Sequence, residues 1–239
     1  MSNMLFARVD DGSDWDSFAD RHEAGRALAA RLQDLKDQDP VVLALPRGGV
    51  PVGYEIAQAL NAPLDLILVR KIGVPFQPEL AYAAVVGGTH PELVINQQVA
   101  REFRLPYDML LDARESALQE IARRRRLYLG DRPQPSVTDR TAIIVDDGIA
   151  TGSTMRAAIR AIRRSRPKKL VVAAPVAPPE TLAVLRYETD ALVCLLTPGD
   201  MPAIGVFYDD FHQLSDDEVI ALLHQAEVRD AGQRRSASS

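Results

Sequence analysis

The sequence has few cysteines, few tryptophans and no long apolar run, and each shortage excludes a class of protein. One cysteine, Cys194, and one tryptophan occur in 239 residues, so neither a disulfide framework nor a CxxC metal site can be built. Apolar runs such as Ala191–Leu196 are far shorter than the ~20 residues that cross a bilayer. The N-terminus turns acidic where a signal peptide needs a basic start and an apolar stretch. We therefore expect a protein of the reducing cytoplasm, with no membrane partner.

The net charge is modest, at −5, but it is unevenly distributed. Residues 101–170 carry 16 basic and 9 acidic side chains, whereas residues 171–239 carry 4 and 11. Two basic runs, Arg123–Arg126 and Arg163–Lys169, have the composition of sites for nucleic acid or a phosphorylated ligand. Both runs fall at the ends of predicted helices, where cations complement the negative end of the helix dipole. We therefore favour solvent-exposed helix ends, and we do not expect nucleic acid as a partner.

Short apolar runs alternate with amphipathic patterns along the chain. Five apolar runs predict strands that are buried on both faces: 41–45, 64–69, 141–145, 170–176 and 191–196. Four stretches with helical periodicity predict helices: 18–35, 50–60, 153–164 and 180–187. This alternation is typical of a parallel sheet covered by helices on both faces. We predict an α/β fold with a mostly parallel, five-stranded sheet.

Two stretches depart from this alternation and predict an inserted, flexible arm. Short β-like pieces at 81–86 and 93–95, separated by Gly87-Gly88, predict a hairpin beside the main sheet. A long helix is predicted over 106–129, with five apolar residues on its buried side: Leu110, Leu111, Ala117, Leu118 and Ile121. After Ala226 the chain is nearly free of apolar side chains, so residues 227–239 are predicted to be a disordered tail. Residues 1–226 would then form a single domain.

The most informative stretch runs from Ile143 to Thr154. A buried strand delivers two adjacent carboxylates, Asp146 and Asp147, at its C-terminal end, where ligands of open α/β sheets bind. The loop that follows is rich in small and hydroxyl residues and leads into a helix, so that its N–H groups and the helix N-terminus can hold an anion. The residues of this loop are Gly148, Ile149, Ala150, Thr151, Gly152, Ser153 and Thr154. A phosphate monoester fits the loop, and neighbouring hydroxyls or a metal-bound water fit both carboxylates, which together describe a sugar phosphate.

Two common nucleotide-binding loops are excluded by inspection. A Walker A motif needs a lysine after its last glycine, and none follows Gly152; the GxGxxG fingerprint does not occur in the chain. The hydrophobic strand, acidic pair and Thr-Gly-Ser-Thr loop closely resemble the phosphoribosyl pyrophosphate signature of the type I phosphoribosyltransferases. The alternative interpretation of this stretch is an ordinary Asx turn and a capped helix.

The resemblance extends to two further loops and covers roughly residues 41–200. In that family the loop after the first core strand binds pyrophosphate, through a planar cation and through N–H groups that glycines leave exposed. That loop corresponds here to Pro46, Arg47, Gly48 and Gly49. After the second strand, Arg70 and Lys71 are similar to the family's basic segment that reaches the pyrophosphate, although Lys71 alone would suit a solvated strand end. The segments LALPRGGVPVGYEIA, VRKIGVPFQPELAYAAV and GVFYDDFHQLSDDEV resemble a bacterial group of phosphoribosyltransferases with an unassigned acceptor.

The resemblance implies a glycosyltransferase of the pentosyl class, active in nucleotide metabolism, that moves the phosphoribosyl group of phosphoribosyl pyrophosphate to a nitrogen acceptor such as a nucleobase. Asp146, Asp147 and Arg47 are the implied catalytic residues. Mg²⁺ is the implied cofactor, held by substrate oxygens and water near the two carboxylates rather than by a protein cage. The candidate assembly is a homodimer. A small hood from the terminal segments would cover the site, and the arm would act as a lid.

Two other functions fit the same residues. One is a non-catalytic sensor of phosphoribosyl pyrophosphate or a nucleotide that regulates a partner protein, and the other is a scaffold that docks through the acidic C-terminal third. Three further residues each have two interpretations. Glu79 is either a general base for the acceptor or an exposed turn glutamate, and Phe207 and Tyr208 either stack on a base or pack in the core. For the two aromatic residues we favour core packing.

Overall fold

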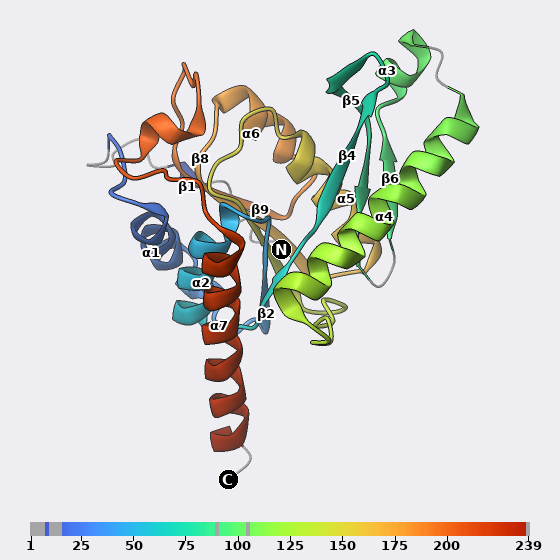
Figure 1. Ribbon diagram of the computed structural model, residues 1–239. Helices are drawn as coiled ribbons and strands as arrows, with labels where there is room; N and C mark the ends of the chain where they lie inside the picture. The colour runs from blue at the N-terminus through green and yellow to red at the C-terminus, as the bar shows by residue number, and fades with distance from the viewer. Residues whose placement is uncertain (1–7, 10–15, 89–90, 104–105, 238–239) are drawn as a thin grey trace.

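The main sheet is parallel, as the alternating pattern predicts. The computed structural model describes residues 8–9, 16–88, 91–103 and 106–237. Its strands pair in the order β1-β9-β8-β7-β2-β3, and all of these pairs are parallel (Figure 1). The strands are β1 (Arg8–Val9), β2 (Pro40–Ala44), β3 (Leu64–Leu66), β7 (Thr141–Val145), β8 (Lys169–Val176) and β9 (Ala191–Leu196). The five-stranded parallel sheet is confirmed, and the two-residue strand β1 extends it at the edge beside β9.

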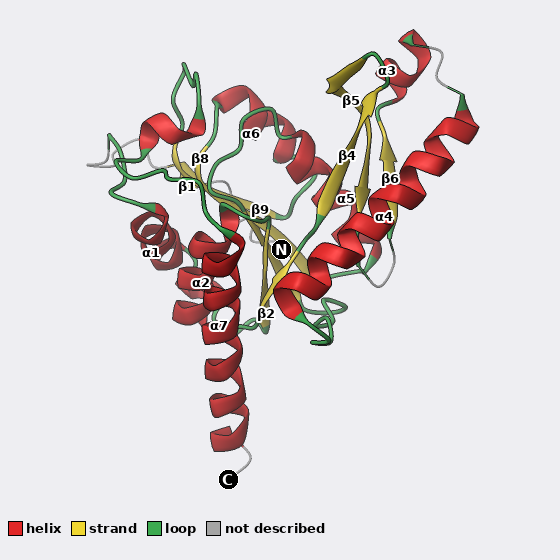
Figure 2. Ribbon diagram, viewed as in Figure 1, coloured by secondary structure: helices red, strands yellow, loops and turns green. Residues whose placement is uncertain are grey.

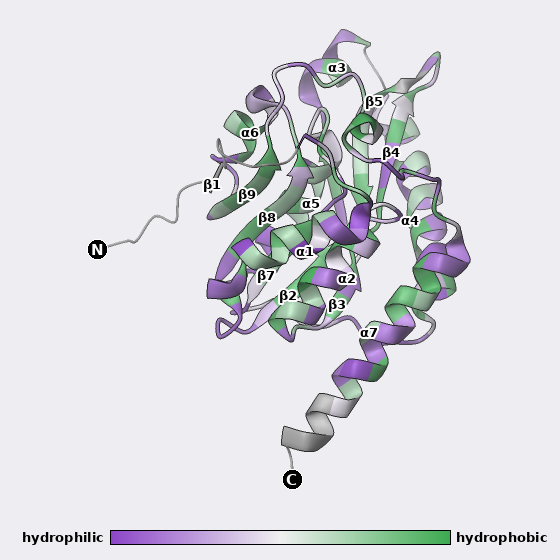
Figure 3. Cartoon of the chain, turned by 90° about the vertical axis from the view of Figure 1, so that its left-hand side faces the viewer, coloured by the Kyte–Doolittle hydropathy of each residue, from purple (hydrophilic) through white to green (hydrophobic). Residues whose placement is uncertain are grey.

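Helices cover both faces of this sheet (Figure 2). Alternate residues of β2 explain why: Val42 and Ala44 belong to one buried cluster, and Val41 and Leu43 belong to a second one behind it. The first cluster includes α1 (Arg21–Arg31), the short helix η1 (Gln33–Leu35), α2 (Gly49–Leu60) and α7 (Asp216–Ala237). The second includes α5 (Ser153–Arg164) and α6 (Pro179–Leu185). Figure 3 shows the apolar strands enclosed between these helices.

The inserted arm is a second, antiparallel sheet with a helix along it. Strands β4 (Val69–Val74), β5 (Gln77–Val86) and β6 (Glu92–Ile95) pair in that order, and α3 (Gln97–Glu102) and α4 (Tyr107–Leu129) follow. The predicted hairpin is confirmed as β5 and β6, but the residues after Leu66 form the additional strand β4. The long helix is also confirmed. Its expected buried side is wrong at Leu111, which is 42% exposed, because only the stripe through Leu110, Ala117 and Ile121 meets the core.

The two ends of the chain meet in a region that we call the hood, formed by residues 16–20 and 197–215. Its short helix η2 spans Ile204–Phe207. The backbone N–H of Phe18 donates to the Phe207 carbonyl at 2.9 Å, and the N–H of Asp209 donates to the Phe18 carbonyl at 2.8 Å. These bonds hold the N-terminal segment against the chain that follows β9.

The segment after Ala226 is helical, whereas the sequence predicts disorder there. Helix α7 continues to Ala237 and projects from the body of the molecule (Figure 1). Ala226 is buried, and Arg229 Nη2 donates to the Ala62 carbonyl at 3.0 Å. The Arg229 contact thus ties this part of the helix to the turn after α2. Within the described ranges, no helix is long and apolar enough to cross a membrane.

Candidate functional site

A cavity of about 230 Å³, which we call the central cavity, lies beyond the carboxyl ends of β2, β3 and β7. Its polar lining comes from separate elements, namely the β2–α2 loop, the end of β7, the first turn of α5, strand β4 and helix α4. The polar and loop residues that line it are Pro46, Asp146, Thr154, Arg70, Glu120 and Arg124. The structure therefore brings together the three loops that the sequence singled out, and adds α4 to them.

The glycines of the β2–α2 loop allow it to touch the end of β7. A Cβ atom at Gly48 would overlap the carboxylate of Asp147, and one at Gly49 would lie 2.7 Å from the Val145 carbonyl oxygen. The expectation that both glycines offer free N–H groups is wrong at Gly49, whose N–H donates to the Leu45 carbonyl at 3.0 Å. The two glycines thus serve close packing of two loops.

Arg47 does not line the central cavity, although the preceding residue, Pro46, does. Its Nη1 is 3.8 Å from Asp216 Oδ1, in the first turn of α7. The Tyr128 hydroxyl donates to the same oxygen at 2.6 Å. Burial, aided by Asp216, raises the pKa of Tyr128 to about 12, so this hydroxyl stays protonated. Asp216 therefore holds a cation and a phenol at once.

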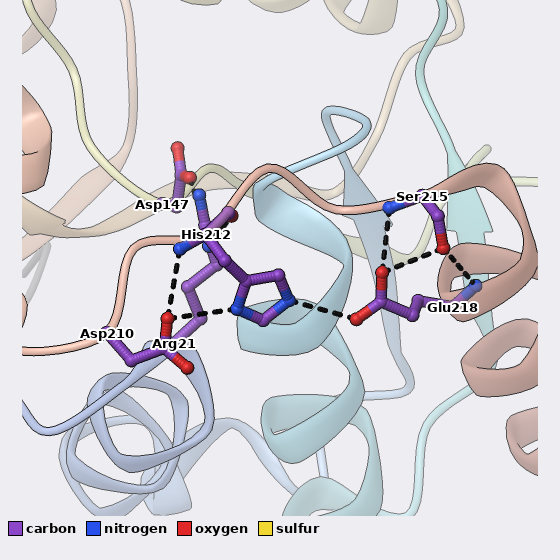
Figure 4. A network of polar contacts seen from close by, with 6 residues as sticks. All are labelled: Arg21, Asp147, Asp210, His212, Ser215 and Glu218. Carbon is purple, nitrogen blue, oxygen red and sulfur yellow. Dashed lines mark hydrogen bonds and ion pairs between the residues drawn. The ribbon is translucent and has the colours of Figure 1, made fainter.

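Asp147 pairs with Arg21 of α1 and does not line the central cavity. The sequence predicts that both carboxylates meet the ribose, but Asp147 is 8% exposed and its Oδ2 accepts from Arg21 Nε at 2.8 Å. Figure 4 shows Arg21 beside Asp147 and His212, and Arg21 donates to the His212 carbonyl at 3.1 Å. The guanidinium carbon of Arg21 also lies 3.8 Å from the centre of the Phe211 ring. A buried guanidinium needs a charged partner. Asp147 is therefore committed to the buried ion pair that joins α1 to the end of β7.

Asp146 is the member of the acidic pair that lines the central cavity. Its Oδ1 accepts the backbone N–H of Asp147 at 3.0 Å. Burial, and then the charge of Asp147, raise the pKa of Asp146 well above the usual 3.8. This carboxyl group can bind a proton, accept from a hydroxyl, or face a cation that restores its charge.

The loop between β7 and α5 divides into a packed part and a part available for an anion. The N–H of Ile149 donates to the Val176 carbonyl at 2.9 Å, and a Cβ at Gly148 would overlap Ile204 of the hood. These two residues, predicted to bind substrate, are engaged in packing. The following residues 150–154 enter α5 through Gly152, whose φ of 71° favours glycine.

The first turn of α5 has the groups that an anion site requires. N–H groups in the first turn of a helix have no carbonyl one turn earlier, and the helix dipole adds positive charge there. Thr154 lines the central cavity, and the Thr151 hydroxyl is 3.3 Å from Ser153 Oγ. The Ala150 carbonyl accepts from the Thr181 hydroxyl at 2.6 Å, which fixes the turn from outside.

Arg70 and Lys71 lie on opposite faces of strand β4. Arg70 lines the central cavity, whereas Lys71 lines a separate cleft between the arm and α5. Successive side chains of a strand point to opposite faces of the sheet, so the predicted basic segment cannot place both cations on one ligand group. Of the pair, Arg70 has the position expected of a pyrophosphate contact.

Helix α4 contributes residues that the sequence analysis missed. Arg124 Nε pairs with Glu120 Oε1 at 2.8 Å, and the neighbouring Arg123 pairs with Glu120 Oε2 at the same distance. Arg123, followed by Arg124, lowers the pKa of Glu120 to about 2. Arg124 follows Ile121 of the buried stripe by three residues. Residues at this spacing lie on the same face of a helix, so the sequence contains a signal that Arg124 points toward the core side rather than belonging to an exposed run.

The sequence predicts that the whole basic run 123–126 is exposed to solvent. The structure shows that only part of it is. Arg125 Nη1 reaches Oδ1 of the fully buried Asp65 at 3.1 Å, and Arg132 approaches the same oxygen at 3.7 Å. The run contains a surface residue, a cavity residue and a structural residue in succession. Helical geometry, which rotates each residue by about 100°, accounts for the three roles.

Of the remaining residues that the sequence analysis singled out, two pack in the core and the side chain of one lies outside the described residues. Tyr208 is buried against Phe18 and Phe211, and its hydroxyl donates to the Asp147 carbonyl at 2.6 Å. Phe207 packs partly buried against the same core, so core packing is confirmed for both aromatic residues. The side chain of Glu79 lies outside the described residues.

Comparison with known proteins assigns the family. The model of the phosphoribosyl transferase domain matches residues 85–206. The chain belongs to the phosphoribosyl transferase family. The family match contains Asp146, the loop through Thr154 and the cavity residue Arg124, while the Pro46 loop and Arg70 precede it.

Relatives of known sequence or structure agree with this membership. Curated proteins from Mycobacterium tuberculosis strains CDC 1551 / Oshkosh and ATCC 25618 / H37Rv, provisionally named phosphoribosyl transferases, are each 45% identical over 209 residues, or 87% of this chain. The chain spans 47% of the length of each of these relatives. The crystal structure of TT1426 from Thermus thermophilus is 38% identical, with a TM-score of 0.76 over 87% of this chain and 98% of that one.

Proposed function

We propose that this protein transfers the phosphoribosyl group of phosphoribosyl pyrophosphate to a nitrogen acceptor of the nucleobase class, and releases pyrophosphate. The observation that carries the proposal is the central cavity. Two carboxylates, two arginines and the start of a helix surround one space of about 230 Å³. Of the carboxylates, Glu120 is paired with the arginines of α4, which leaves Asp146 for the ribose and the cationic groups for the phosphates of that substrate.

Each part of the substrate has a group suited to it. The 5-phosphate would bind the N–H groups and hydroxyls of residues 150–154. The ribose hydroxyls would donate to Asp146. The pyrophosphate would lie between the Pro46–Gly49 loop and the guanidinium groups of Arg70 and Arg124, with Arg47 joining it by exchanging Asp216 for the anion.

In the proposed reaction, the bond between C1 of the ribose and the pyrophosphate oxygen breaks, and a bond from the acceptor nitrogen to C1 forms on the opposite face. The electron pair of the broken bond leaves with pyrophosphate, and the acceptor nitrogen loses its proton. Arg70 and Arg124 stabilise the charge that develops on the leaving group. The Asp146 carboxylate would stabilise the positive charge on the ribosyl centre, as carboxylates do in glycoside cleavage.

The residues fit Mg²⁺ bound through the substrate rather than by the protein alone. In the described part of the chain, no group of three or more His, Cys, Asp or Glu side chains could hold a metal ion. Asp146 offers one partly buried carboxylate, and Mg²⁺ binds readily to one or two carboxylates together with phosphate oxygens and water. When bound, the ion would neutralise charge on the pyrophosphate.

The compartment and the assembly are proposals as well. The only cysteine, Cys194, is a buried free thiol, which supports the cytoplasm. The homodimer stays a prediction from the family.

Pyrophosphate release is the test of the proposed reaction. The protein is incubated with phosphoribosyl pyrophosphate, Mg²⁺ and each of a panel of nucleobases, and released pyrophosphate is measured beside Asp146→Asn as the impaired control. We expect at least one base to give release that Asp146→Asn lowers by roughly ten- to hundredfold. Tight binding without release for every base would support the sensor function and contradict the transferase.

A further inference from the structure

A second cavity, of about 480 Å³, lies between the arm and helix α5, and we call it the arm cleft. Strands β5 and β6 provide an apolar wall that includes Ala84 and Val94. Lys71 of β4 lines one side, and Arg156 and Arg160 of α5 line the other. The arm cleft shares no lining residue with the central cavity.

The arm cleft carries uncompensated positive charge. Arg156 Nη2 pairs with Glu188 Oε1 at 2.7 Å, whereas Lys71 and Arg160 form no ion pair with any residue in the described part of the chain. None of the described side chains that line the cleft is a carboxylate. Cations gathered in a concave, partly apolar site raise the local concentration of anions, so the cleft is suited to a negatively charged ligand.

The size and the neutral groups of the arm cleft narrow the class of ligand. Its volume lies within the range of about 300–1,000 Å³ that is typical of small-molecule sites. Ser153 offers a hydroxyl, and Gln97 and Gln98 offer amides at the start of α3. Lysine, arginine and hydroxyl groups together bind phosphate well, while the alanine and valine wall accommodates an apolar ring.

We propose that the arm cleft binds a phosphate-bearing ligand of nucleotide size at a site separate from the transferase cavity. The ligand would join Lys71 of the arm to Arg160 of α5. An existing ion pair, between Arg164 Nε and Glu92 Oε1 at 3.1 Å, already links α5 to β6. Ser153 of the cleft is followed in the chain by Thr154 of the central cavity. A ligand that binds in one site would therefore affect the position of the loop that lines the other. The proposal does not depend on transferase activity.

Calorimetric titration with four probes, AMP, GMP, CMP and UMP, tests the site in the presence of saturating ribose 5-phosphate. In the proposed function this competitor would fill the phosphate loop beside Thr154, and it leaves Lys71 and Arg160 of the cleft free for the probe. We expect at least one probe to bind. Lys71→Glu and Arg160→Glu should each weaken that binding at least tenfold. Lys168→Glu and Arg126→Glu are matched controls, since both residues are exposed and lie outside the cleft, and they should bind as the parent does. Circular dichroism verifies that all variants are folded.

Three results would overturn the proposal. The first is that none of the four nucleotides binds, and the second is that the two cleft variants bind as tightly as the two controls. The third is binding that Arg124→Ala abolishes and Arg160→Glu leaves intact, which would assign the nucleotide to the central cavity. Because pyrophosphate release is measured separately, a protein that binds nucleotide in the cleft but transfers nothing would contradict only the proposed function.

Discussion

The main sheet and the arm sheet differ in how their strands are covered. Every residue of β2 and of β7 is buried, whereas two of the six residues of β4 and none of the four in β6 are buried. A strand covered on both faces has its ends fixed by the core on each side. Strand β4, which is covered incompletely, instead contributes Arg70 to the central cavity and Lys71 to the arm cleft. The main sheet therefore positions the site, and the arm distributes residues between two sites.

Adjacent residues show this difference most directly. At the end of β7, Asp146 lines the central cavity, while Asp147 forms an ion pair with the buried Arg21. On β4, Arg70 lines the central cavity while Lys71 lines the arm cleft. In the main sheet the second residue of the pair maintains the fold, and in the arm it remains accessible to a ligand. The variants below separate these roles.

The largest effect on stability is expected from Asp147→Asn. The change leaves the guanidinium of Arg21 buried without its carboxylate, and removing one partner of a buried ion pair costs about 3 kcal/mol or more. Urea unfolding should show this loss. Asp146→Asn is the control and should lose little, because burial already disfavours the charged form of Asp146. Equal stability of the two variants would contradict the division of roles between the carboxylates.

Arg124→Ala should weaken pyrophosphate binding by roughly ten- to hundredfold, since a hydrogen bond to a charged group contributes about 1.5–3 kcal/mol. Arg123→Ala provides a matched control: it removes a partner of the same Glu120, but from the exposed side of α4. Its affinity, measured by calorimetry, should equal that of the parent. A similar loss in both variants would indicate a general effect of charge instead of a contact in the cavity.

Hydrogen exchange compares the two sheets without any substitution. In the absence of ligand, amides of β4 and β6 should exchange faster than those of β2 and β7, because their strands have less buried surface to hold them closed. Phosphoribosyl pyrophosphate with Mg²⁺ should slow exchange in β4 and β5 as the arm closes. Arm exchange that is unaffected by saturating ligand would argue against the lid.

The smallest effect is expected in the hood. Ser215 and Glu218 form a capping box at the start of α7, and Glu218 also accepts from His212, whose other ring nitrogen meets Asp210 (Figure 4). Glu218, and then Asp210, raise the pKa of His212 above 6.5. The stabilisation from protonated His212 is therefore full below pH 6.5 and lost as pH rises through the raised value.

Thermal unfolding is followed from below pH 6.5 to above the raised pKa of His212. The Tm should fall slightly as the pH rises, and His212→Gln should reduce that fall. Both carboxylates stay ionised throughout, since their pKa values are lowered, that of Glu218 to about 2. A pH dependence that is identical in the parent and His212→Gln would assign the effect to another group.

The sequence predicted most of the main sheet because its signals are local. The strand at 141–145 and the helix at 153–164 agree with the observed bounds, since a short apolar run and a loop of small and hydroxyl residues before a helix can both be identified from adjacent residues. Strand β4 was missed because its half-exposed residues lack a continuous apolar run.

The orientation of the site side chains could not be predicted, because it depends on partners that are distant in the sequence. Asp147 turns toward Arg21, which is 126 positions away, and nothing in the acidic pair itself distinguishes it from Asp146. Arg125 is likewise drawn to the buried Asp65 across 60 positions. Loop identity could thus be predicted from the motif, while the roles of neighbouring side chains required the packed structure.

Above all, we infer that Asp146, and not Asp147, serves the ligand in the central cavity. The decisive experiment is calorimetric binding of phosphoribosyl pyrophosphate with Mg²⁺ to the parent and to Asp146→Asn. We expect Asp146→Asn to bind roughly ten- to hundredfold more weakly while its free energy of unfolding stays near that of the parent. Affinity equal to the parent's in the folded variant would contradict this inference and remove Asp146 from the site.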